Sequence, residues 1–129
     1  MNMPARTKND LSKDQTNNYW AAYFIVSDAL SFCREKLVSQ EQSPGDPASQ
    51  GSSRPALANI EANLASLQAL RMRFNAGQSK VLPPDPVLIR SLALGSAKLT
   101  GIVGDPARLP EVIEIAAEIV SKFHALEEL

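Results

Sequence analysis

The chain is poor in the residues from which reactive centres are built. Its 129 residues include one cysteine, Cys33, and one histidine, His124. A single cysteine cannot form an internal disulfide, and its presence fits a reducing compartment. The histidine has no cysteine or second histidine near it in sequence, so the metal-binding spacings are missing. The six glycines are scattered and form no phosphate-binding loop. We therefore expect no enzyme activity, no cofactor and no metal.

Strong charge and long apolar runs are also missing. The formal net charge is −1, which provides no overall field to attract nucleic acid or an anionic membrane. The longest apolar run, residues 19–26, is far shorter than the roughly 20 residues that cross a bilayer, and Asp28 follows it. The first ten residues are polar and do not resemble a secretory signal. The sequence therefore predicts a soluble, cytoplasmic protein without a membrane partner.

The apolar/polar alternation that marks a strand is absent over any useful length, and three breaks rich in proline, glycine or serine divide the chain, at 42–55, 75–86 and 100–110. The remaining four segments have helical apolar periodicity: 16–40, 54–75, 85–102 and 110–127. They predict an all-α fold, either a four-helix bundle or two helical hairpins, which a second copy could complete by dimerisation. We expect a disordered N-terminal arm at 1–15, and a single helical domain at 16–129 with a flexible linker at about 42–55.

Local signals mark some helix ends. Asp85 followed by Pro86 predicts a capping carboxylate and a first-turn proline at the start of the third helix. Gly77 predicts the end of the second helix. Gly95 and Gly101 each weaken the third helix by roughly 1 kcal/mol relative to alanine, unless a neighbouring helix needs a close approach there.

Aromatic residues are few, one Trp, two Tyr and four Phe, yet four of them fall between positions 19 and 24. In helical projection Tyr19 and Tyr23 lie on the main apolar stripe, whereas Trp20 and Phe24 lie to one side of it. A helix that is apolar nearly all round needs neighbours on more than one side. The four residues therefore form a candidate partner interface. Two alternatives are that another part of the chain covers them, or that Tyr19, Tyr23 and Phe24 line a pocket for an apolar ligand.

A row of alanines in the second helix, Ala58, Ala62, Ala65 and Ala69, lies nearly opposite its leucine stripe. Alanine is the best helix former and is harmless on a solvent-facing surface, which is the interpretation we favour. If the row does pack, a dimer is the simplest source of the extra partner.

Charge is unevenly distributed, because residues 54–108 carry seven basic and three acidic side chains, whereas 109–129 carry one and five. This pattern has two interpretations. The fourth helix could pair with the middle of the chain, or a basic strip on helices two and three could contact an anion or nucleic acid through Arg71, Arg73, Arg90 and Lys98. Our leading hypothesis is a non-enzymatic adaptor, regulatory or homodimeric module that acts by protein–protein contact. A nucleic-acid-binding regulator and an apolar-ligand pocket are the alternatives.

Overall fold

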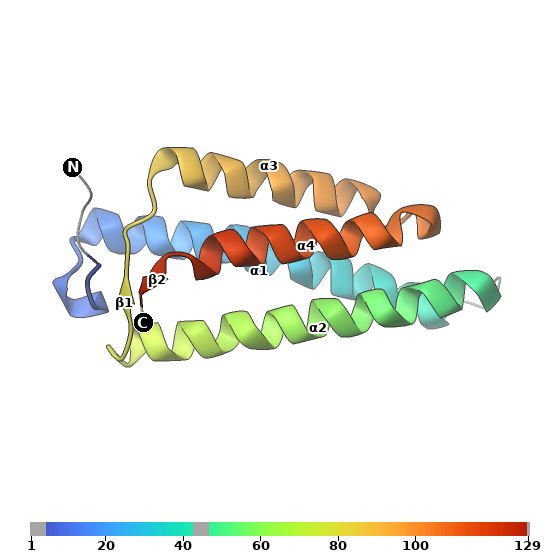
Figure 1. Cartoon of the computed structure of the whole chain (residues 1–129), viewed down its shortest axis with the longest axis horizontal. Helices are drawn as coiled ribbons and strands as arrows, with labels where there is room; N and C mark the ends of the chain where they lie inside the picture. Colours follow the sequence, from blue (N-terminus) through green and yellow to red (C-terminus); the bar gives the residue numbers. More distant parts are fainter. Residues whose placement is uncertain (1–4, 43–46, 129) are drawn as a thin grey trace.

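The computed structural model describes the backbone of residues 5–42 and 47–128, which forms a four-helix bundle (Figure 1). Its helices are α1 (Lys13–Gln42), α2 (Pro47–Asn75), α3 (Pro86–Ile102) and α4 (Leu109–His124). Successive helices run in opposite directions, so α1 with α2 and α3 with α4 make two hairpins that lie side by side (Figure 1). The predicted all-α fold is confirmed: the four helices of one chain form a bundle, in which the two hairpins pack against each other.

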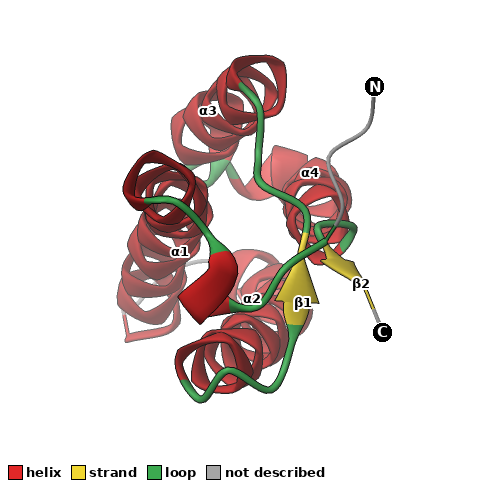
Figure 2. Cartoon of the chain, turned by 90° about the vertical axis from the view of Figure 1, so that its left-hand side faces the viewer, coloured by secondary structure: helices red, strands yellow, loops and turns green. Residues whose placement is uncertain are grey.

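The helices are arranged in the order α1, α2, α4, α3 around the bundle axis. Both α1 and α4 pack against α2 and α3, which places α2 and α3 at opposite corners (Figure 2). The connection from α2 to α3 crosses the end of the bundle and contains β1 (Lys80–Val81). This strand pairs antiparallel with β2 (Glu127–Glu128), after the end of α4. A two-residue strand is too short to show a periodicity, so no pattern in the sequence predicts this pair.

The core is made of the apolar stripes that the sequence predicts. In α1, Val26, Leu30, Cys33 and Leu37 are fully enclosed. The stripes of the other helices meet them, and their buried members include Ile60, Leu67, Phe74, Leu92, Leu99, Val112, Ala116, Ile119 and Phe123. Burial of these side chains is the main stabilising contribution, at about 25 cal/mol for each Å² of apolar surface removed from water.

Helix ends follow the predicted signals at two positions. The Asp85 carboxylate accepts a hydrogen bond from the Leu88 backbone N–H at 2.7 Å, which caps the start of α3. After α2, Gly77 has a φ of 70°, in the left-handed region. The Gly77 N–H donates to the Phe74 carbonyl and the Gln78 N–H donates to the Arg73 carbonyl, the two bonds of a Schellman motif.

The start of α2 differs from the expectation. The sequence predicts a flexible linker at 42–55, whereas α2 begins at Pro47 and contains Pro55. A proline in the first turn is compatible with a helix, since the first N–H groups have no intrahelical partner. Pro55 removes the hydrogen bond to the carbonyl of residue 51, yet the helix continues. The part of the predicted linker at 43–46 lies outside the described residues.

Residues 5–12 also differ from the expectation of a disordered arm. Arg6 exchanges two backbone hydrogen bonds with Val81 of β1, at 2.9 and 2.8 Å. A short 3₁₀ turn (Lys8–Asp10) follows, and the Leu11 side chain is only 9% exposed. The segment therefore packs against the end of the bundle, where Leu11, its one large apolar residue, supplies the anchor. Residues 1–4 of the predicted arm lie outside the described residues.

Candidate interaction surfaces

The aromatic run of α1 divides into an inner and an outer pair. Tyr19 and Tyr23 are 2% and 4% exposed, so they belong to the core. The sequence analysis placed them in a candidate partner interface, but they are not available to a partner. The Tyr19 ring stacks on Phe74 of α2 with centroids 3.9 Å apart, and lies 5.4 Å from Phe123 of α4. Burial, with a smaller contribution from the Glu127 carboxylate, raises the pKa of Tyr19 far above its ordinary value. These two tyrosines join three helices at one end of the bundle.

The outer pair remains at the surface. Trp20 is half-buried and packs edge-on against Phe74, with ring centroids 5.5 Å apart. Phe24 lies next to it, with centroids 6.0 Å apart, and is 49% exposed. Together with Arg71 and Asn75 of α2, these residues line a shallow groove between α1 and α2. We call these four residues the aromatic face.

Arg71 is the cation of the aromatic face. Its guanidinium carbon lies 5.8 Å from the centroid of the Tyr23 ring, in a cation–π arrangement. This contact holds the Arg71 side chain beside Trp20, and Arg71 and Trp20 both line the groove. The result is an arginine placed next to exposed aromatic surface, a combination that is common at the centre of protein interfaces.

The predicted alanine row is exposed along its whole length. In helical projection Met72, which is 62% exposed, lies between the row and the α2 residues of the aromatic face, together with Glu61 and Gln68. Glu61 is exposed and lies 3.4 Å from Arg34 of α1, so this outer side of α2 carries an ion pair as well as small and apolar side chains. The alanine row and Met72 therefore form a stripe of small and apolar side chains that is separate from the aromatic face.

The four basic residues proposed as an anion or nucleic-acid contact do not share a face. Arg71 and Arg73 belong to α2, and Arg90 and Lys98 belong to α3, at the opposite corner of the bundle (Figure 2). Moreover, Arg73 donates to the nearly buried carboxylate of Glu127 at 2.9 Å. A phosphate backbone could not contact all four at once, so the geometry does not favour the predicted basic strip.

Two of these cations instead reach acidic residues near the ends of α4. Besides the pair between Arg73 and Glu127, Lys98 lies 3.7 Å from Glu111. These contacts agree with the interpretation that the acidic end of the chain pairs with its basic middle. Because the side chains of Lys98 and Glu111 are largely or partly exposed, this ion pair adds little to stability.

The histidine and the cysteine occupy separate places. His124 Nε2 lies 2.8 Å from the Ser66 hydroxyl, and this contact joins α4 to α2. The sequence gives no reason to single out Ser66, since the two residues are 58 positions apart. Cys33 is enclosed in α1, and burial raises the pKa of its thiol to about 11. About 15 Å of α1 lie between Cys33 and Tyr23. The Tyr23 ring contacts Phe123, the residue before His124, so the cysteine and the histidine lie in different parts of the bundle.

Two further searches concern the described residues alone. None of the helices in that part of the chain combines the length and apolar character that a bilayer-spanning helix needs. No group of three or more His, Cys, Asp or Glu side chains among the same residues is arranged to hold a metal ion. Comparison of the chain with protein-family models, with curated proteins and with solved structures finds no match.

Proposed function

We propose that this protein is a non-enzymatic, cytoplasmic interaction module that forms a homodimer through the aromatic face. The observation that carries the proposal is the exposure of Phe24, at 49%, beside a half-buried Trp20. A soluble protein gains by removing such a surface from water, and aromatic side chains with a neighbouring arginine provide much of the binding energy at interfaces.

The surroundings of the aromatic face favour contact with another helical surface. A stable interface buries roughly 800 Å² on each partner, more than two aromatic rings supply. The exposed alanines and Met72 of α2 offer further small and apolar side chains on the same helix, and the alanines would let a partner helix approach closely. A second copy presents the same surface, so a two-fold contact buries apolar area on both sides at once.

The test is sedimentation equilibrium from low to high micromolar concentration, with Phe24→Gln as the variant. We expect the parent protein to self-associate, and the variant to dissociate at least about tenfold more readily, as for an interface hot spot. The matched control is Leu94→Gln on α3, which removes an apolar side chain that is 68% exposed, away from the aromatic face. This control should associate like the parent protein.

Two outcomes would contradict the proposal. One is a monomer across the whole concentration range. The other is a dimer that Phe24→Gln leaves intact. Trp20 supplies an independent signal, because it is the only tryptophan and its fluorescence should become less accessible to a soluble quencher as the dimer forms.

A further inference from the structure

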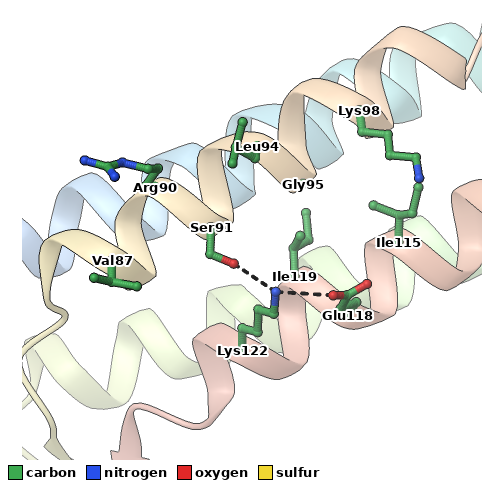
Figure 3. Close-up of a pocket in the computed structure, with 10 residues that line it drawn as sticks. All are labelled: Val87, Arg90, Ser91, Leu94, Gly95, Lys98, Ile115, Glu118, Ile119 and Lys122. Carbon is green, nitrogen blue, oxygen red and sulfur yellow. Dashed lines mark hydrogen bonds and ion pairs between the residues drawn. The ribbon is translucent and has the colours of Figure 1, made fainter.

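A second groove lies between α3 and α4, and it includes no residue of the aromatic face (Figure 3). Its apolar lining comes from both helices: Val87, Leu94, Gly95, Ile115 and Ile119. Gly95 brings the backbone of α3 close to Ile119, which forms the floor. The groove is therefore an open, apolar channel between two antiparallel helices.

Two residues of α3 make this groove unusual for a solvent-facing surface. Val87 is 74% exposed and Leu94 is 68% exposed. They are two helical turns apart, about 10 Å along the axis. A helix docked in a groove makes apolar contacts at the same i, i+7 spacing. The sequence analysis placed neither of them in a candidate site.

The charged lining of the groove has an excess of cations, three against one carboxylate. Lys122 donates to the Ser91 hydroxyl at 2.9 Å and lies 3.2 Å from Glu118, so its charge is largely satisfied (Figure 3). No described carboxylate forms an ion pair with Arg90, and Lys98 has a long contact with Glu111. Arg90 and Lys98 mark opposite ends of the groove, eight residues or about 12 Å apart (Figure 3).

This charge arrangement opposes the packing of a second copy onto the groove. An antiparallel α3–α3 contact centred on Leu94 would bring Arg90 of one copy against Lys98 of the other. Like charges held opposite each other at an interface cost free energy and disfavour that partner. A segment with carboxylates at the same spacing would pair with both cations.

We propose that the groove between α3 and α4 binds an acidic amphipathic helix of another protein. The apolar side chains of that helix lie over Leu94, Val87 and Ile119. Its flanking Asp or Glu residues, seven or eight positions apart, pair with Arg90 and Lys98. The apolar floor supplies affinity, and the two cations supply the charge preference and the direction of the bound helix.

The test uses three fluorescein-labelled helical peptides that share one leucine stripe and carry Glu, Gln or Lys at the flanking positions. Fluorescence anisotropy should show saturable binding of the Glu peptide, about tenfold weaker binding of the Gln peptide, and no binding of the Lys peptide. Leu94→Gln and Arg90→Glu should each weaken binding of the Glu peptide by about tenfold or more. Because both side chains are exposed, neither change should disturb the fold.

The matched control is Phe24→Gln, which should leave peptide binding unchanged and so separates this proposal from the proposed dimer contact. The groove is excluded as the site if no peptide binds saturably, or if both groove variants bind like the parent protein. Equal binding of the Glu and Lys peptides would remove the charge argument. A self-association that Leu94→Gln abolishes would show that a second copy occupies the groove, contrary to the proposal.

Discussion

At the scale of single residues, Gly95 shows how one missing side chain sets the distance between two helices. A Cβ atom at this position would lie 2.6 Å from Cγ2 of Ile119. The sequence analysis expected a glycine here to weaken α3 unless a neighbouring helix came close, and α4 is that helix. The cost in helix propensity is therefore offset by packing that no larger residue permits.

We expect Gly95→Ala to lower the free energy of unfolding by about 1–2 kcal/mol, because the overpacking cost exceeds the gain in helix propensity. The Cγ2 atom of Ile119 is attached directly to Cβ, so it moves only by rotation about χ1, which is restricted for a β-branched residue in a helix. Gly101→Ala is the control, since nothing lies within 4 Å of a Cβ atom at that position. It should leave stability unchanged or raise it by up to about 1 kcal/mol in urea denaturation. A stabilising Gly95→Ala would contradict the close approach.

Cys33 should be unreactive while the protein is folded. It is enclosed, and burial raises the pKa of its thiol to about 11, so little thiolate forms near neutral pH. We expect a thiol-specific disulfide reagent to label Cys33 only after urea unfolding. One thiol per chain should then react. Fast labelling of the native protein, at the rate seen in urea, would show that α1 does not enclose this residue.

The same thiol makes stability depend on pH in the alkaline range. Its pKa is about 11 in the folded protein and 9.0 ordinarily, so the folded state keeps the proton that the unfolded chain loses. The free energy of unfolding should therefore fall as the pH rises from about 9 toward 11. Cys33→Ala should show a shallower fall between about pH 9 and 10, before Tyr19, which adds to the same trend, begins to contribute. Parallel curves for the two proteins would exclude this contribution.

At the scale of the element, the start of α3 is stabilised by its capping carboxylate. Asp85→Ala removes the hydrogen bond to the Leu88 N–H and should lower the free energy of unfolding by about 1 kcal/mol. Asp85→Asn keeps an acceptor at the same place and should retain most of that stability. Thermal unfolding followed by circular dichroism compares the three proteins. If Asp85→Asn and Asp85→Ala lowered the free energy of unfolding equally, the stabilisation would come from the negative charge rather than from the capping hydrogen bond.

How far the elements could be predicted depends on how local their signals are. The Asp85–Pro86 start and the Gly77 stop need only a few adjacent residues, and both were predicted. The start of α2 was not, because Pro47 is compatible with both a linker and a first helical turn. Helical projection predicts that Tyr19 and Tyr23 lie on the apolar stripe and that Trp20 and Phe24 lie beside it. The rings that cover the tyrosines, Phe74 and Phe123, lie far away in sequence, and no local pattern identifies them.

At the scale of the whole molecule, the arrangement of the helices could not be predicted from the sequence. All four apolar stripes are similar, so each helix could pack against any other. The order α1, α2, α4, α3 decides that Arg71 and Arg90 lie at opposite corners, and it removes the predicted basic strip. It also creates the groove at Leu94. Helical projection places this leucine off the buried stripe of α3, but only the packing of α3 on α4 sets it beside a groove.

The N-terminal segment tests whether the end of the bundle is closed as the structure shows. Leu11 is 9% exposed, so Leu11→Ala should lower the free energy of unfolding by about 1–2 kcal/mol, less than for a fully enclosed leucine. Leu82→Ala is the matched control, since this leucine is 37% exposed and should cost no more than about 0.5 kcal/mol. Hydrogen exchange should find the Arg6 and Val81 amides protected, because each donates to the other's carbonyl. If Leu11→Ala had no effect and the Arg6 amide exchanged freely, residues 5–12 would be the disordered arm that their composition predicts.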